Sequence, residues 1–432
     1  MKPFDVDLAK EELILQWAQD HVMSVSHELK PLIDKRTEAI TPLLEKVLDA
    51  FAHEKLGSHH FASLTGYAHG DQSRTVIDNI FARVLGAEAA AVRLQIVSGT
   101  HAIAAALFGV LRPGDSLLSL TGKPYETLEE VIGIRGFGNG SLKEFGVKYD
   151  ELNLIDHNKF DFDLLEIALK VPRKMIFIQR SCGYSWRPSL SIKIIEKICM
   201  IVHKVSPDTV CFVDNCYGEF VEEIEPCEVG ADLIAGSLIK NLGGTIVPTG
   251  GYIAGRKDLV EKSCCRLTSP GIGSQGGTGF DLHRLVLQGL FLSPQMVVEA
   301  LLGADLVCAV FHKLGFPVSP QLGEHRSDLI QIVQLNSPEA LRVACQSLQL
   351  SSPVGAYLEP VPSSMPGYGS DLLMAGGTFI DGSTSELSAD APLRPPYNLF
   401  IQGGTSRSHV QLALIRLLVD LFKAGFITLP QT

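Results

Sequence analysis

The 432-residue chain is short of positive charge, with 37 Lys and Arg against 48 Asp and Glu and a formal net charge of −11. Such an acidic chain repels nucleic-acid phosphates and anionic membranes, so neither is expected as a partner. A membrane-length apolar run is also missing, since the longest, over residues 102–111, falls far short of the roughly 20 residues that span a bilayer. The chain begins without a signal-type apolar stretch, which favours a cytoplasmic location.

Cysteine patterns typical of disulfide frameworks and metal sites are missing as well. The nine cysteines show neither CxxC nor Cys/His metal spacing, and several lie in apolar runs, among them Cys199, Cys211 and Cys308. Reduced thiols in a cytosolic protein are the simplest interpretation, and no metal is expected. Because 46% of the residues are apolar, the chain can bury a large core without disulfides.

The pattern along the chain changes twice, which predicts three parts. Residues 1–58 have helical spacing and few glycines. Over residues 59–295 helical stretches alternate with short apolar runs such as Val210–Val213, which predicts an α/β domain with a mainly parallel sheet flanked by helices. Residues 296–432 begin with a long helical pattern and continue into a proline-rich mixed region, which we interpret as a smaller α+β C-terminal domain.

Two reactive side chains each follow an apolar run. Asp214 comes directly after Thr209–Val213, and Lys240 comes directly after Ala231–Ile239. Both runs are expected to be short buried strands or strand edges. An amine and a carboxylate at one end of a sheet suit pyridoxal 5'-phosphate, because the amine can form a Schiff base with the cofactor aldehyde and the carboxylate can keep the pyridine nitrogen protonated. Taken alone the pair is weak evidence, since such residues are more often simply solvated.

The segment Ser98-Gly99-Thr100 is the strongest signal for phosphate binding. It follows an apolar run and precedes an alanine-rich helical stretch, so its backbone N–H groups are expected at a helix N-terminus, which favours a phosphate. An ordinary N-cap is the competing interpretation. Ser237, three residues before Lys240, could supply a further hydroxyl to the same phosphate.

Tyr125 and the trio Gln179-Arg180-Ser181 each follow a predicted strand at the same edge of the sheet. Tyr125 could stack on the pyridine ring, or it could simply pack in a turn. One of the trio is expected to contact the phenolic oxygen of the cofactor or the substrate. We assign Ser181 to the cofactor and Arg180 to the substrate as hypotheses.

Two other patterns are weaker. Residues 271–276 read GxGxxG, but no buried strand precedes them and the following segment is still glycine-rich, so a nicotinamide cofactor is not favoured. His59, His60 and His69 lack partners at helical metal-ligand spacing, and we interpret them as loop histidines.

The chain resembles fold-type I pyridoxal-phosphate enzymes, and more specifically the methionine gamma-lyase-like family often labelled aluminium resistance proteins. The first sign of the resemblance is the order along the chain of Ser98-Gly99-Thr100, Tyr125, Asp214, Ser237 and Lys240. The similarity covers most of the chain. It is carried by Thr65–Asp71, Ile96–Ile103, Leu111–Asp115, Phe212–Val221, Ala235–Asn241, Arg266–Gly273, Met365–Tyr368 and Glu386–Asp390.

The resemblance implies the fold-type I fold with a smaller C-terminal domain, and a homo-oligomer, a dimer or homotetramer, whose active sites are shared between subunits. It implies that Tyr67 reaches the cofactor phosphate of a neighbouring subunit. It further implies that an arginine of the C-terminal domain binds the substrate carboxylate, with Arg394 the first candidate and Arg407 the second. Departures from the family pattern are Gly243-Gly244-Thr245, where a proline is expected, and Gln275, where an acid is expected.

The resulting hypothesis is a pyridoxal-phosphate-dependent carbon–sulfur lyase that acts on a sulfur amino acid of the cystathionine or methionine type, by beta- or gamma-elimination. Lys240, Asp214 and Tyr125 would be its catalytic residues. An aminotransferase or a carbon–carbon lyase is the alternative with the same cofactor. A non-catalytic binding or regulatory protein that keeps the fold is the alternative from another class.

Overall fold

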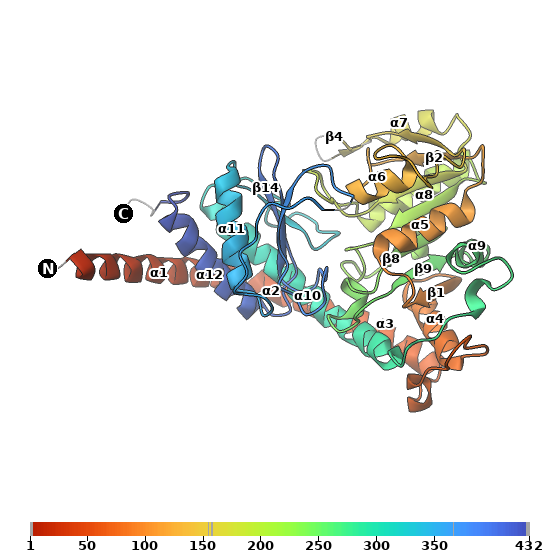
Figure 1. The fold of residues 1–432 in the computed structure, drawn as a ribbon, viewed down its shortest axis with the longest axis horizontal. Helices are drawn as coiled ribbons and strands as arrows, with labels where there is room; N and C mark the ends of the chain where they lie inside the picture. Colours follow the sequence, from red (N-terminus) through yellow and green to blue (C-terminus); the bar gives the residue numbers. More distant parts are fainter. Residues whose placement is uncertain (1–2, 154, 157–158, 366, 429–432) are drawn as a thin grey trace. The chain divides into compact units, whose positions relative to one another are not determined.

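The computed structural model describes residues 3–153, 155–156, 159–365 and 367–428 (Figure 1), so Pro366 of the Met365–Tyr368 motif lies outside the described residues. Two compact units make up the chain. The large unit comprises Thr41–Pro294 and Arg326–Asp328, and the small unit comprises Met1–Ile40, Gln295–His325 and Leu329–Thr432. The three-part division at residues 58 and 295 stays a prediction.

The large unit is built on a seven-stranded sheet in the order β1-β9-β8-β7-β6-β2-β3. Strand β9 is antiparallel to both neighbours and the remaining pairs are parallel, so the predicted mainly parallel sheet is confirmed. The strands are β1 (Ala89–Arg93), β2 (Ser116–Ser119), β3 (Lys148–Glu151), β6 (Met175–Gln179), β7 (Val210–Asp214), β8 (Leu233–Ser237) and β9 (Gly251–Gly255); β4 (Ile155–Asp156) and β5 (Lys159–Phe160) form a separate hairpin.

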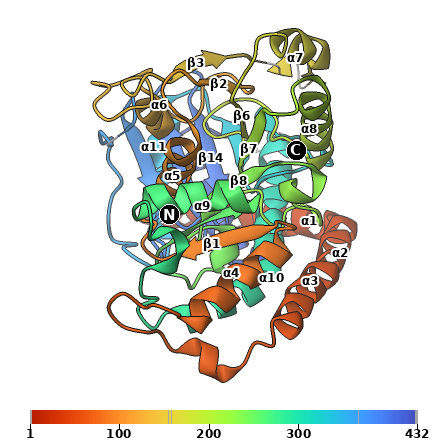
Figure 2. The same cartoon turned by 90° about the vertical axis from the view of Figure 1, so that its right-hand side faces the viewer.

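Helices flank this sheet, as Figure 2 shows for α5 and α9, which lie side by side. Their apolar side chains pack on alternate strand residues such as Phe177 and Phe212. The intervening residue Cys211 contacts Cys199 of α8 on the other face, because successive strand side chains point to opposite faces. The helices are α3 (Ile40–His53), α4 (Gln72–Val84), α5 (Gly99–Val110), α6 (Glu126–Ile132), α7 (Phe162–Ala168), α8 (Ile192–Val205) and α9 (Lys257–Leu267), with 3₁₀ turns η1 (Ser58–Phe61), η2 (Pro226–Val229), η3 (Asn241–Gly243) and η4 (Gly273–Gln275).

The small unit has an antiparallel sheet in the order β10-β11-β14-β13-β12, covered by helices whose apolar residues share its core. This combination confirms the predicted α+β character of the C-terminal part. Its strands are β10 (Val318–Ser319), β11 (Gln331–Gln334), β12 (Leu372–Ala375), β13 (Ser388–Pro392) and β14 (Asn398–Gln402), and its helices are α1 (Pro3–Glu28), α2 (Lys30–Glu38), α11 (Pro338–Leu350) and α12 (Arg407–Lys423).

Helix α10 (His283–Lys313) runs from the large unit into the small unit and contains Pro294 at the junction. Among the described residues it is the one helix that is long and apolar enough to cross a membrane. The most apolar 18-residue stretch of this helix is 61% buried inside the protein, as in a core helix.

Candidate active site

The carboxyl ends of three neighbouring parallel strands bring the predicted residues to one edge of the sheet. Gln179 ends β6, Asp214 ends β7 and Ser237 ends β8, and Gln179 lies directly beside Asp214 in the strand register. Lys240 follows three residues after Ser237. Ligands of open α/β sheets bind outside this end of the strands, so the arrangement has the expected position for a cofactor site.

Asp214 is 4% exposed, and its Oδ1 accepts a hydrogen bond from the Cys216 amide at 3.1 Å. Burial raises the pKa of Asp214 to about 6, against the effect of the Cys216 hydrogen bonds and of the positive charges of Lys240 and Arg187. A further cation beside this carboxylate would lower its pKa again. Asp214 is therefore suited to holding a protonated ring nitrogen.

Lys240 is half-buried, and its Nζ lies 3.5 Å from the centroid of the Tyr217 ring. The turn that follows it depends on two glycines. A Cβ on Gly243 would come within 1.8 Å of the Leu238 carbonyl oxygen, and Gly244 has a φ of +53°. The Gly243-Gly244 sequence thus has a local steric reason, because it lets the chain after Lys240 turn tightly against β8.

The segment Ser98-Gly99-Thr100 forms the N-terminus of α5, next to the end of β8. The Ser98 hydroxyl caps the helix by accepting the His101 amide at 3.1 Å, so the ordinary N-cap interpretation describes this side chain. A Cβ on Gly99 would lie 3.0 Å from Cys216 Sγ and 3.5 Å from the Ser237 Cβ. The first amides of the helix have no partner within it, so Gly99 presents backbone donors close to Ser237.

Tyr125 lies at the same edge, where both its backbone amide and its side-chain hydroxyl make hydrogen bonds. Its amide donates to Gln179 Oε1 at 2.7 Å, and its hydroxyl is 2.8 Å from Thr100 Oγ1. Burial raises the pKa of Tyr125 well above its ordinary value, and the charge of Asp214 raises it further. Tyr125 therefore stays a neutral phenol, rigidly placed near Asp214 and the α5 N-terminus.

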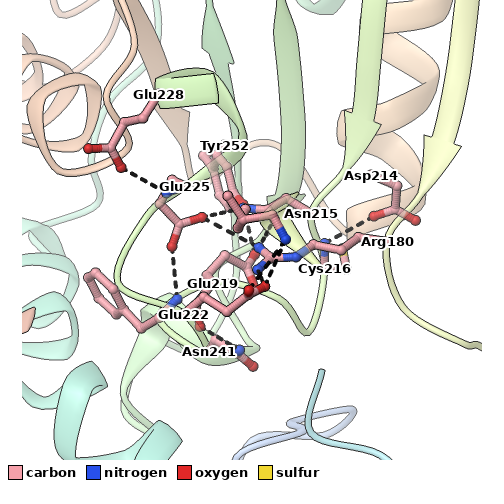
Figure 3. A network of polar contacts seen from close by, with 12 residues as sticks. Arg180, Asp214, Asn215, Cys216, Glu219, Glu222, Glu225, Glu228, Asn241 and Tyr252 are labelled. Atoms are coloured by element: carbon pink, nitrogen blue, oxygen red, sulfur yellow. Dashed lines mark hydrogen bonds and ion pairs between the residues drawn. The ribbon is translucent and has the colours of Figure 1, made fainter. Parts of the chain in front are cut away.

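The Arg180 side chain does not join the other predicted site residues at this edge of the sheet. It is fully buried, and its guanidinium donates to Asn215 Oδ1 at 2.7 Å and to Glu222 Oε2 at 2.9 Å, with Glu225 at 3.7 Å (Figure 3). Its charge is thus balanced inside the protein. Ser181 is 5% exposed, and its carbonyl accepts from Gln179 Nε2 at 3.3 Å, which keeps it beside the edge.

A buried polar network lies behind the site and holds the residues that directly follow Asp214 and Lys240 (Figure 3). Asn215 Nδ2 donates to Glu225 Oε2 at 2.9 Å, and Asn241 Nδ2 donates to the Glu219 carbonyl oxygen at 2.8 Å. The Glu219 carboxyl accepts from Tyr252 Oη at 2.8 Å. Burial raises the pKa of Glu219 to about 8, so this carboxyl is mainly protonated at neutral pH. We call Arg180, Asn215, Glu219, Glu222, Glu225, Asn241 and Tyr252 the buried network.

Arg187 is a further cation at this edge that the sequence patterns did not single out. Its Nη2 donates to the Gln179 carbonyl at 3.0 Å, and its charge lowers the pKa of Asp214. The one available signal was its position between Trp186 and Pro188, shortly after β6.

Tyr67 is 80% exposed and its ring stacks on His69 with centroids 5.4 Å apart. Arg74 supports the loop that carries Tyr67, because its Nη1 donates to the carbonyls of Ala68 at 3.0 Å and Gly277 at 2.9 Å. The ring is thus presented outward on a supported loop.

The remaining predicted residues belong to other segments of the chain. Arg394 is exposed between β13 and β14 and Arg407 begins α12, so both belong to the small unit and their substrate role stays a prediction. The GxGxxG segment follows helix α9, not a strand, and includes the η4 turn. His59 and His60 lie in the η1 turn rather than in a loop, and His60 Nδ1 accepts from the Gly57 amide at 3.1 Å.

Comparison with known proteins gives one consistent family. A family model described as methionine gamma-lyase matches residues 18–422. The chain is 47% identical to the protein YnbB of Bacillus subtilis over 384 residues, which are 88% of this chain and 91% of that one.

Two solved structures are similar over nearly the whole chain. A Listeria monocytogenes protein, described provisionally as a cystathionine beta-lyase involved in aluminium resistance, is 44% identical with a TM-score of 0.89, over 92% of this chain and 98% of its own. A carbon-sulfur lyase involved in aluminium resistance from Clostridium novyi is 41% identical with a TM-score of 0.89, over 98% and 99% of the two chains.

Proposed function

Since this chain belongs to the methionine gamma-lyase family and is a pyridoxal-phosphate-dependent carbon–sulfur lyase, we propose that it eliminates a thiol from a sulfur amino acid of the cystathionine or methionine type. The observation that carries the proposal is the meeting of Asp214, Lys240 and the α5 N-terminus at one edge of the sheet. Beta- and gamma-elimination both fit this set of groups.

Pyridoxal phosphate, when bound, supplies an electron sink that stabilises negative charge at the substrate Cα. In the proposal Lys240 holds the cofactor and then moves the Cα proton at its Nζ. Asp214 carries the negative charge that keeps the ring nitrogen protonated. The hydroxyl of Ser237 and the N-terminal residues of α5 (Ser98, Gly99 and Thr100) would hold the phosphate, and Tyr125 and Ser181 would bind the rest of the cofactor.

The exposed position of Tyr67 supports a shared site in a dimer or tetramer, because its ring is free to reach beyond its own subunit. We expect Tyr67→Phe to weaken retention of the cofactor during dialysis without changing the oligomer. His53→Asn, at another exposed position of the large unit, serves as the control. Equal cofactor retention in Tyr67→Phe and wild type would remove Tyr67 from the site.

Arg394 is the proposed partner of the substrate carboxylate. Because a carboxylate is held equally in the ground and transition states, Arg394→Ala should mainly raise KM and leave cofactor binding intact. Arg407→Ala tests the second candidate in the same assay. The proposed role belongs to Arg407 if its variant alone shows the increase in KM.

The activity itself is tested with fully cofactor-loaded enzyme and a panel of cystathionine, methionine, cysteine and close analogues, scored separately for keto acid and for thiol. Release of both supports elimination, and the carbon that loses the thiol distinguishes the beta from the gamma reaction. Keto acid with amino transfer but without thiol indicates an aminotransferase. A shift of the cofactor absorbance on adding amino acids, without any product, indicates a binding protein. The proposal also includes a cytoplasmic location.

A further inference from the structure

Four potential metal ligands gather at the opposite end of the strands that carry Asp214 and Lys240. Cys211 is the second residue of β7, and Asp232 directly precedes β8. Cys199 and His203 lie four residues apart on α8, so they share one face of that helix. A metal was not expected from the cysteine spacing, because the Cys-x3-His pair on α8 gains its partners only when β7 and β8 pack beside the helix.

Three of these side chains, His203, Cys211 and Asp232, are already close to one another. His203 Nε2 lies 3.0 Å from Asp232 Oδ2, and the ligand atoms of His203, Cys211 and Asp232 all lie within 4.8 Å of one another. The Cys211 thiol also interacts with the Cys199 thiol. One sulfur, one imidazole and one carboxylate therefore converge on a single small volume, and Cys199 interacts with the sulfur among them.

We propose that Cys199, His203, Cys211 and Asp232 bind a zinc-class divalent cation. Zinc prefers four tetrahedral ligands of these types at about 2.0–2.3 Å, which places neighbouring ligand atoms roughly 3.3–3.8 Å apart. The separations among the ligand atoms of His203, Cys211 and Asp232 bracket these values, so closing these three around a cation requires shifts of about 1 Å or less. With Cys199 as the fourth ligand, protein would fill all four positions, so the proposed site is a structural one.

Access and charge are compatible with this assignment. Both thiols are buried, whereas the side chains of His203 and Asp232 are 35% and 10% exposed, so a cation can reach the cluster from their side. Asp232 Oδ1 pairs at 3.4 Å with Arg256, which is 50% exposed and can turn into solvent. Asp232 Oδ2 also accepts the Cys211 amide at 2.8 Å, which holds the carboxylate in place.

The position of the cluster predicts what the cation does. Cys211 precedes Asp214 by three residues on the same strand, roughly 10 Å away. A cation there would link α8 to the starts of β7 and β8 and would stabilise the large unit. It would touch none of the residues proposed for the lyase reaction, so this inference does not depend on that proposal.

The test uses cofactor-loaded enzyme that has been dialysed against chelator and then titrated with Co²⁺ as a spectroscopic probe. We expect one tightly bound equivalent with the visible bands of tetrahedral cobalt and a thiolate-to-cobalt band, all displaced by one equivalent of Zn²⁺. Zinc should also raise the melting temperature of the chelated protein, because it binds the folded state alone. Absence of the tetrahedral bands in wild type overturns the proposal.

Variants locate the site. Cys211→Ser should remove most of the thiolate-to-cobalt band, and the half-exposed His203→Asn should weaken Co²⁺ binding at least tenfold while folding normally. Cys265→Ser and His27→Asn, which change a thiol and a histidine outside the cluster, should bind as wild type does. If the bands survive in His203→Asn with unchanged affinity, the cation binds elsewhere and the assignment is wrong.

Discussion

The edge that carries Asp214 and Lys240 and the buried network behind it contain the same kinds of charged groups in different surroundings. In the network, Arg180 is fully buried and is matched by the carboxylates of Glu222 and Glu225. At the edge, Lys240 is half-buried against an aromatic ring, and Asp214 has a raised pKa with few direct partners. Charges that are fully matched hold the loops in place, whereas incompletely matched charges remain available for chemistry.

Among the changes that test this comparison, replacing Lys240 should have the largest effect. Lys240→Ala should abolish turnover, because no other group at the edge supplies an amine at this position. Turnover of the sulfur amino acid cleaved by wild type measures the loss. Lys123→Ala, at an exposed lysine near Tyr125, should leave turnover unchanged. A borohydride-reducible cofactor adduct on another lysine of the Lys240→Ala variant would contradict the assignment.

Removing the arginine of the network should instead destabilise the fold. Arg180→Met leaves the buried Glu225 and the partly buried Glu222 without their cation, so we expect a loss of about 3–5 kcal/mol in the free energy of unfolding. Urea denaturation measures it. Arg83→Met, which removes a pair that is 43% exposed at the arginine, should change stability by about 0–1 kcal/mol. An increase in KM without loss of stability would instead support the prediction that Arg180 binds the substrate.

Neutralising Asp214 should reduce activity more than stability. Asp214→Asn cannot carry the charge that balances a protonated ring nitrogen, so kcat should fall on the order of 10² or more, equivalent to about 2.7 kcal/mol of barrier. Steady-state kinetics with saturating cofactor gives the value, and Asp208→Asn in the exposed turn before β7 is the control. Near-normal kcat would refute the role of Asp214.

The last expected effect is on the pH dependence of stability rather than on activity, and it comes from Glu219→Gln. The folded protein keeps the Glu219 proton up to a pKa of about 8, whereas the unfolded chain loses it near the ordinary value of 4.5. The native state binds more protons in this window, so wild-type stability should fall as pH rises from about 4.5 to about 8. Glutamine imitates the protonated acid and removes this contribution.

Unfolding free energies of wild type, Glu219→Gln and the exposed control Glu223→Gln across this pH window provide the measurement. The wild type should lose stability relative to Glu219→Gln as the pH increases, and Glu223→Gln should follow wild type. Parallel pH profiles of wild type and Glu219→Gln would show that Glu219 ionises normally in the folded protein.

The sequence by itself determined the mainly parallel sheet, its flanking helices and the family. Apolar runs alternating with helical stretches specify parallel strands, and parallel strands end at the same edge. Asp214 and Lys240 could therefore be placed together from local patterns alone. The same argument located Ser237, which ends β8, whereas Gly99 begins α5 six residues after the end of β1.

Only the tertiary structure decided where side chains point once their strands have ended. Arg180 and Ser181 are neighbours in the sequence, yet Arg180 turns into the buried network while Ser181 stays beside the edge. Arg187 contacts the end of β6 because the loop that follows this strand brings it back there. Cys199 lies against Cys211 because α8 packs on the sheet. Such contacts join segments distant in sequence, and no local pattern of polar and apolar residues encodes them.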